Sequence, residues 1–163
     1  QSKKEENVMF EEMRLKAQQL SDEETIALLD AGEYGVLSTI GANGYPYGVP
    51  INYIYDDGKI YIHSAVKGHK LRNFEYDSRV SFCVVAEAEL LQEDVNTMFK
   101  SVIAFGKIRE LTEMKDKQRV FEMMIRKLCP DFIPSGLEYV EENKDAARVY
   151  EIEIEHITGK KGE

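Results

Sequence analysis

The sequence predicts a mainly β protein, a six-stranded antiparallel barrel with flanking helices. Three observations lead to this fold class. Six short segments have the composition of strands, turn residues such as Asn43-Gly44 and Asp57-Gly58 separate neighbouring strands, and most helix-forming residues come before or after the β run. The 163 residues suffice to bury a core without disulfides or metals. We therefore expect one domain over residues 13–163, preceded at 1–12 by an N-terminal extension or the remnant of a tag.

The first half of the predicted order is a helix followed by three strands. Ser21 and Glu24 have the spacing of a capping box that begins the helix, and Gly32 ends it. The strands expected next are 34–40, 47–55 and 59–64. Pro50 interrupts the second of these strands, and the residues alone favour an edge strand or a bulge at this point. The alternative is backbone left free to meet a planar ligand.

The second half alternates helices and strands. We expect a short helix from His69, strands at 79–86 and 100–111, a helix at 115–128, a short helix after Pro134, and a closing strand at 149–157 with one buried face. The acidic segment 87–94 reads as a solvated loop or short helix rather than a metal cage.

The charge balance excludes several classes of partner. The net charge of −9 argues against binding to nucleic acid or to an anionic membrane. No apolar run approaches the roughly 20 residues that span a bilayer, and the N-terminal residues lack the apolar core of a signal peptide. The two cysteines have no metal-ligand spacing, so we predict no metal site and a cytoplasmic protein.

One stretch departs from this acidic background. Residues 59–74 contain four cations and two histidines with no acidic residue until Glu75. The pattern predicts a strand, a loop containing Gly68 and the start of a helix, an arrangement that offers backbone N–H groups and a favourable dipole to a phosphate. The alternative, a solvated basic surface loop, is equally open on the local sequence because no established phosphate-binding motif is present.

Several motifs occur in a fixed order: GEYGVLST, GYPYGVPINY, IYIHSAVKGHK, RVSFCVV and the closing IEIEHITGK. Together they resemble the flavin-binding split β-barrel superfamily related to pyridoxamine 5'-phosphate oxidase, and within it the nitroimidazole-resistance (Nim) family. The resemblance covers about residues 13–159 and depends on the order of the motifs more than on any one of them. It implies that the predicted barrel is the FMN-binding split barrel.

The resemblance also implies a homodimer with flavin at its interface. By position, the flavin ring follows the second strand, the phosphate lies on the loop and helix start, and Ser101 reaches the cofactor from the partner subunit. The implied cofactor-binding residues are Tyr47, Gly48, Val49, Pro50, Ile51, Asn52, Ile62, His63, Ser64, Lys67, His69, Lys70 and Ser101. The expected cofactor is FMN, with FAD as the alternative. The oxidase branch has a substrate-binding lysine where this chain has Asn52, and its C-terminal arginine motif is missing, so vitamin B6 oxidation is not expected.

Two functions remain open on these residues. The first is an FMN-dependent oxidoreductase of the Nim type, reducing nitroimidazoles or other small oxidised compounds with an external donor such as a nicotinamide. His63 is then the expected catalytic residue, as proton donor or substrate orienter, although a hydrogen-bonded barrel histidine is the alternative. The second is a non-catalytic flavin- or small-ligand-binding protein, acting in storage, sensing or scavenging, because the residues that hold a cofactor serve either role.

Overall fold

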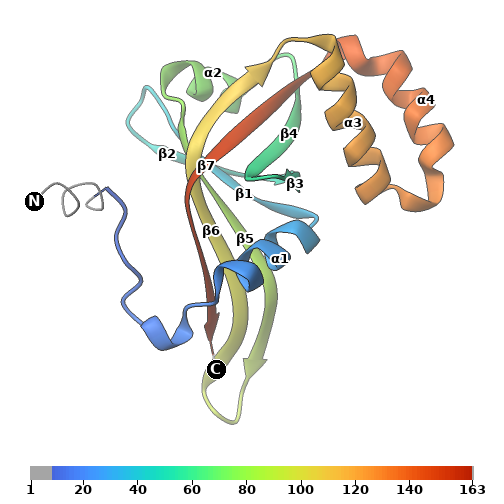
Figure 1. Ribbon diagram of the computed structural model, residues 1–163. Coiled ribbons are helices and arrows are strands. Elements are labelled where there is room, and N and C mark those ends of the chain that lie inside the picture. Colours follow the sequence, from blue (N-terminus) through green and yellow to red (C-terminus); the bar gives the residue numbers. More distant parts are fainter. Residues whose placement is uncertain (1–8, 163) are drawn as a thin grey trace, which may run out of the picture.

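A computed structural model describes residues 9–162, which form a curled antiparallel sheet of seven strands flanked by helices (Figure 1). Residues 1–8 of the predicted extension lie outside the described residues, as does Glu163. The strand order is β2-β1-β5-β6-β7-β4-β3. The elements are η1 Lys16–Gln18, α1 Asp22–Ala31, β1 Tyr34–Ile40, β2 Pro46–Asn52, β3 Ile54–Asp56, β4 Lys59–Ala65, α2 His69–Tyr76, β5 Arg79–Leu91, β6 Asn96–Leu111, α3 Met114–Leu128, η2 Pro130–Phe132, α4 Ile133–Asn143, η3 Lys144–Ala146 and β7 Ala147–Gly162.

The predicted fold class is confirmed, and the seventh strand arises from a break in a predicted one. The expected strand at 47–55 is divided at Tyr53 into β2 and β3, which lie at opposite edges of the sheet. Tyr53 is fully buried and donates its hydroxyl hydrogen to the carbonyl of Leu29 in α1. Its backbone N–H bonds to the carbonyl of Glu33. The chain therefore turns inward at Tyr53, and this burial fixes where it leaves one edge of the sheet for the other.

The prediction of a loop or short helix at 87–94 is wrong. Strands β5 and β6 continue through this segment as a hairpin whose last pair is Leu91 and Asn96. The hairpin projects from the sheet (Figure 1), so most of its side chains are exposed on both faces. Lys100 pairs with Glu87 across the two strands at 3.1 Å. Without a buried face, the hairpin lacks the apolar alternation that marks a strand in sequence.

The main core fills the interior of the curled sheet. Ile60 and Ile62 of β4 and Phe82 of β5 are buried there, while Leu29 of α1 and Leu71 of α2 belong to the same cluster. Burying one such side chain contributes about 1.5–3 kcal/mol. The capping box predicted at Ser21 begins α1 as expected. Helices α1 and α2 thus complete a barrel-like core that positions the inward residues of β4.

A second core lies on the outer side of β3, β4 and β7, where α3 and α4 pack. It joins Tyr61 and Val149 from the strands to Val120 and Met124 of α3 and Val140 of α4. Strand β7 is consequently buried on both faces over Val149–Ile152, so the prediction of a single buried face is wrong. No helix within residues 9–162 combines the length and apolar character needed to cross a membrane.

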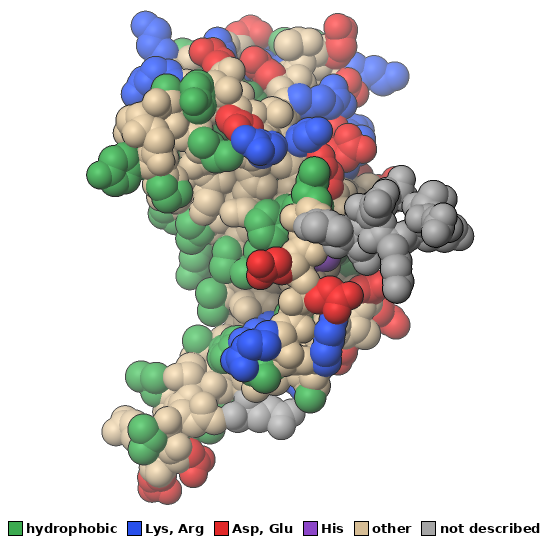
Figure 2. All heavy atoms as spheres, turned by 90° about the vertical axis from the view of Figure 1, so that its left-hand side faces the viewer, with side chains coloured by type: hydrophobic (Ala, Val, Ile, Leu, Met, Phe, Trp, Pro, Cys, Tyr) green, Lys and Arg blue, Asp and Glu red, His purple; other side chains and the backbone are tan. Residues whose placement is uncertain are grey.

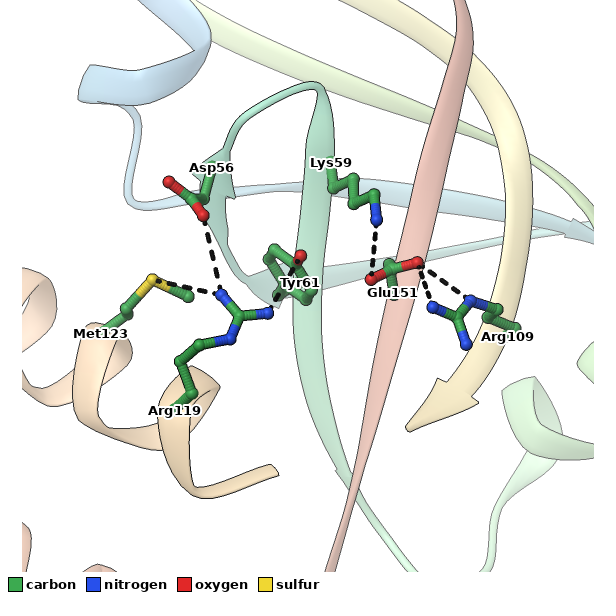
Figure 3. Close-up of polar contacts among 7 residues, drawn as sticks. All are labelled: Asp56, Lys59, Tyr61, Arg109, Arg119, Met123 and Glu151. Atoms are coloured by element: carbon green, nitrogen blue, oxygen red, sulfur yellow. Dashed lines mark hydrogen bonds and ion pairs between the residues drawn. The ribbon is translucent and has the colours of Figure 1, made fainter. Parts of the chain in front are cut away.

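Polar contacts also attach α3 to the sheet (Figure 3). The guanidinium of Arg119 lies 3.4 Å from the hydroxyl of Tyr61 and 3.7 Å from a carboxylate oxygen of Asp56. The arginine is further within 5.4 Å of the centre of the Tyr61 ring. These contacts bring the outward side of β4 directly under α3.

Candidate functional site

Strand β2 forms one free edge of the sheet and presents an exposed face. It pairs only with β1 among the described residues. Its burial alternates: Tyr47, Val49 and Ile51 are half-buried, whereas Gly48, Pro50 and Asn52 are exposed. An edge strand is where proline is tolerated, which confirms the edge interpretation of Pro50. Backbone groups on the free side of β2 are therefore available to a ligand.

The start of α2 lies against this strand. The ring of His69, the first residue of α2, lies 4.0 Å from the ring of Tyr47, centre to centre. Lys70 follows, and its positive charge acts on His63 at the end of β4. The pKa of the His63 imidazole is lowered from its ordinary value. The larger cause is partial desolvation by the surrounding atoms, and the second is repulsion from the charge of Lys70. The structure thus pairs Tyr47 with His69 and places Lys70 near His63, while their roles in binding a cofactor stay predictions.

The basic side chains of this region are available to bind an anion. None of the ion pairs within residues 9–162 involves Lys67, His69, Lys70 or Arg72. Gly68 precedes α2 and supplies no side-chain cap, so the first N–H groups of the helix receive no capping hydrogen bond from a side chain. Cations, free N–H groups and the positive end of the helix dipole together suit a phosphate.

The predicted phosphate residues divide over two sides of the helix. His69 lies toward β2, as its ring contact with Tyr47 shows, and Lys70 lies near enough to His63 of β4 to lower the pKa of that imidazole. Lys67 instead lines a shallow hollow with Arg72 and Arg148. Glu75 also lines this hollow and Arg148 pairs with Glu110 at 3.6 Å, so Lys67 and Arg72 are the two cations of the hollow that join no ion pair within residues 9–162.

The inward residues of β4 contribute differently from His63. Ile62 is fully buried in the barrel core, so only its backbone is open to a ligand. Ser64 is 5% exposed, and its buried hydroxyl has no hydrogen-bond partner among the described residues. An unsatisfied buried hydroxyl is costly, and a ligand at the end of β4 would supply the missing partner.

Two predicted residues have positions that qualify their roles. The side-chain nitrogen of Asn52 donates to the carbonyl of Glu33 at 3.1 Å, which leaves its amide oxygen for a ligand. Ser101 lies on β6, the third strand from β2, and pairs with Val85 and Lys160. The register places it on the same outer face as Gly48, yet within one chain it does not join the cluster around His63.

A cavity next to His63 was not predicted. It has a volume of about 270 Å³ and lies between α3, α4 and the adjoining ends of β4 and β7. Its lining includes His63, Phe121, Met124, Leu128, Tyr139 and Ala147. The amphipathic pattern of α3 was interpreted as a core or interface stripe, and its spacing alone does not distinguish a filled core from a lined cavity.

The donor set fits a flavin phosphate better than a metal ion. Unpaired cations, an uncapped helix start and an orphaned hydroxyl meet the needs of a phosphate, and the exposed edge of β2 offers backbone to a planar ring. Within residues 9–162, no three His, Cys, Asp or Glu side chains are grouped to hold a metal ion.

Sequence comparison supports the same assignment. The family model for pyridoxamine 5'-phosphate oxidase matches residues 21–161, which is most of the chain. The chain belongs to the pyridoxamine 5'-phosphate oxidase family. The match runs from Ser21, which caps α1, into the last residues of β7, and it includes β2, β4 and α2. No curated protein matches the chain significantly in sequence.

Solved structures share the fold of this pyridoxamine 5'-phosphate oxidase family member. A proposed 5-nitroimidazole antibiotic resistance protein from Bacteroides thetaiotaomicron superposes with a TM-score of 0.71 at 17% identity, over 87% of this chain and 85% of that one. An FAD-binding protein from Mesorhizobium loti gives 0.62 at 26% identity, over 90% and 98%. A heme storage protein from Vibrio cholerae gives 0.65 at 15% identity, over 86% and 94%. The fold is that of the flavin-binding split barrel.

Proposed function

We propose that the protein is a homodimeric, FMN-dependent oxidoreductase of the Nim type, which takes electrons from a nicotinamide donor and reduces nitroimidazoles or other small nitroaromatic compounds. The observation that carries the proposal is the convergence of three elements. The imidazole of His69 in α2 lies beside Tyr47 on the free edge of β2, and the neighbouring Lys70, which is in no ion pair within residues 9–162, lies near enough to His63 of β4 for its charge to act there. Two free thiols, Cys83 and Cys129, fit a reducing compartment such as the cytoplasm.

Each residue has a physical role in this proposal. A bound flavin supplies hydride and electron transfer, chemistry that no side chain provides. Lys70 and the start of α2 neutralise the phosphate, while the backbone of β2 follows the ring. His63, whose pKa is lowered by partial desolvation and by the charge of Lys70 although its side chain is exposed, presents an imidazole that hydrogen-bonds a substrate oxygen or holds a proton for it.

The outer face of the sheet supports the homodimer. Large apolar side chains are exposed there on three neighbouring strands: Val36, Val85, Ile103 and Phe105, with Tyr34 at the margin. Figure 2 shows hydrophobic side chains along one side of the molecule, between the charged upper part and the projecting lower end. Exposed apolar patches mark interaction surfaces. Ser101 shares this face, so a second copy would bring its Ser101 toward the cofactor of the first.

FMN is the proposed flavin because one anion position lies directly beside β2 and His63. The hollow of Lys67, Arg72 and Arg148 gives the FAD alternative its best support, since a second phosphate needs further positive charge. Neither Asn52 nor the closing strand carries the oxidase branch's substrate cations, so vitamin B6 oxidation is not proposed.

The deciding experiment begins with the absorption spectrum of the purified protein, before and after denaturation. Flavin bands, and FMN as the released chromophore in chromatography, are expected. Anaerobic oxidation of a nicotinamide donor should then depend on added 5-nitroimidazole. A protein that neither retains nor takes up FMN or FAD would refute the proposal.

A non-catalytic binding protein is the second candidate. His63 has no hydrogen-bond partner among residues 9–162, so no acid–base relay orients it, and binding is the simpler use of the site. A structural relative is a heme storage protein. Stable flavin or heme binding without donor-dependent turnover would favour this role.

A further inference from the structure

We infer that the cavity between α3 and α4 binds a small planar apolar molecule, of one or two rings, with an oxygen acceptor directed at His63. The inference deepens the proposed function, because it assigns the substrate class of the same site and rests on that function for its catalytic meaning. Its test is independent of flavin.

The lining of the cavity is mostly apolar. Met124, Ile125 and Leu128 of α3 form one wall, and Val140 of α4 with Ala147 of β7 forms the facing side. Met124 and Val140 also belong to the outer core, so the walls are held by packing rather than by loops. Methionine adapts its shape to flat ligands, and sulfur–aromatic contacts are favourable.

The size of the cavity restricts the occupant. Native interiors are close-packed, and voids much larger than a water molecule are few. An apolar cavity of about 150 Å³ holds benzene, whereas sites for drug-sized ligands start at about 300 Å³. The cavity is open to solvent beside the exposed side chains of His63 and Tyr139, so its volume of about 270 Å³ suits a one- or two-ring compound and is too small to enclose an extended polycyclic one.

His63 gives the cavity its polar end. Asn143 donates its side-chain N–H to the carbonyl of Tyr139, and Lys144 pairs with Glu141, so the donor groups of both side chains are engaged within α4 and its C-terminal end. The imidazole of His63 instead lines the cavity without a hydrogen-bond partner in the described part of the chain, edge-on to Phe121 at 6.2 Å. A neutral imidazole donates one N–H, which suits a nitro or carbonyl oxygen.

The position of the cavity explains how a bound molecule would meet the cofactor. His63 lines the cavity and also lies near enough to Lys70, at the start of α2, for the charge of that lysine to act on it. A ring in the cavity with its acceptor on His63 thus has its reducible group at the end nearer the flavin position. The apolar remainder of the molecule would be sheltered from water by α3 and α4.

Methyl NMR on the full-length chain tests the site directly. The protein is labelled with ¹³C-methyl methionine, stripped of any flavin and titrated with nitrobenzene. The Met124 methyl signal, assigned with Met124→Leu, should shift and saturate, while that of Met98 on the β5–β6 hairpin should not move. Nitropyrene, with four fused rings, should leave Met124 unchanged. No Met124 shift with nitrobenzene up to its solubility limit would overturn the site.

Two comparisons test the walls and the polar end. Ala147→Phe should fill the cavity and weaken nitrobenzene binding at least tenfold without changing flavin content, and Ala88→Phe, an equal substitution on the exposed hairpin, should leave binding unaltered. If Ala147→Phe fails to fold, the comparison of nitrobenzene with nitropyrene on the natural chain tests the size of the cavity instead. Nitrobenzene should bind more tightly than benzene, and His63→Phe should abolish that preference; an equal affinity for both in the natural chain would refute the role of His63.

The outcomes separate this inference from the proposed function. A Met124 shift in a chain that never binds flavin would support the cavity as a binding site and would refute the proposed oxidoreductase function. Flavin binding and turnover with an unmoved Met124 would keep the oxidoreductase and refute the cavity as its substrate site.

Discussion

The guanidinium of Arg109 binds the almost wholly buried carboxylate of Glu151. The Nε of Arg109 lies 2.9 Å and its Nη2 lies 2.8 Å from Oε1 of Glu151 (Figure 3). The side chain of Glu151 is 4% exposed, and Lys59 approaches its other oxygen at 3.5 Å. Charge on β7 is thus compensated from both neighbouring strands, β6 and β4. This arrangement ties the strand of His63 to the closing strand.

Arg109→Met should destabilise the protein by about 2 kcal/mol. The substitution leaves the buried Glu151 with Lys59 alone, and an uncompensated buried charge is costly, although the exposure of Arg109 reduces the effect. Urea unfolding measures the loss. Lys107→Met is the control, since its pair with Glu155 at 3.7 Å is exposed and contributes below about 1 kcal/mol. The double variant Arg109→Met with Glu151→Met should regain most of the stability, and failure to do so would contradict the charge argument.

Gly106→Ala should cost at least about 3 kcal/mol or prevent folding. A Cβ at Gly106 would come impossibly close to the carbonyl oxygen of Glu153 on β7, and backbone atoms cannot give way as a side chain can. Gly68→Ala is the matched control, because a Cβ there meets nothing within 4 Å. Thermal unfolding compares the stability of the two variants. Equal melting temperatures would contradict the prediction, because they would show that β6 and β7 accommodate the added Cβ without loss of stability.

Features of the fold that depend on local chemistry were easier to predict from the sequence than features that depend on distant contacts. Capping at Ser21, the edge position of Pro50 and the helix start at His69 each depend on local chemistry, which a single sequence displays. The β5–β6 hairpin was missed because its exposed strands carry no alternation, and the break at Tyr53 depends on a partner 24 residues away in α1. Such contacts exist only after folding.

Burial of charged and polar side chains was equally hidden. Glu151 reads as the polar half of an alternating strand, and its burial and its pairing with Lys59 and Arg109 appear only in the folded sheet. The cavity beside His63 depends on how α3 and α4 pack on β4 and β7, which neither helical pattern specifies. The grouping of β2, β4 and α2 was predicted through the family resemblance, which carries three-dimensional information that local spacing lacks.

Lys70→Met should raise the pKa of His63. Burial is the larger cause of its lowered pKa and remains in the variant, but the repulsion from the Lys70 charge disappears. NMR titration of the His63 ring proton measures the change. An unaltered pKa would remove Lys70 from the surroundings of the imidazole.

The same lowered pKa makes folding stability depend on pH. The unfolded chain, with His63 at its ordinary value of 6.5, binds a proton that the folded chain resists. The His63 contribution is therefore constant above about pH 7 and weakens the fold as pH falls through 6.5 toward the folded value. His63→Gln should flatten this part of the stability curve measured by urea unfolding between pH 7 and 5. A curve parallel to that of the natural chain would contradict it.

Lys70→Ala should weaken flavin binding about ten- to a hundredfold, because a charge-assisted phosphate contact contributes about 1.5–3 kcal/mol. Fluorescence titration with FMN measures the affinity. Lys100→Ala is the matched control, since Lys100 pairs with Glu87 on the hairpin, away from α2. An equal affinity for the natural chain and Lys70→Ala would move the phosphate elsewhere.

Val85→Glu should dissociate the proposed dimer and release flavin with it. Val85 is 63% exposed on β5, at the centre of the apolar outer face, and pairs in register with Ser101 of β6. A carboxylate there would be buried without a partner against the second copy, at a cost of several kcal/mol. Phe132→Glu provides the control, because Phe132 is similarly exposed, at 69%, but lies at the turn between α3 and α4. Sedimentation velocity gives the mass, and the flavin-to-protein absorbance ratio gives the occupancy. Loss of the dimer with full flavin retention would place the whole cofactor site within one chain, whereas a dimer that persists would assign the apolar outer face to another partner.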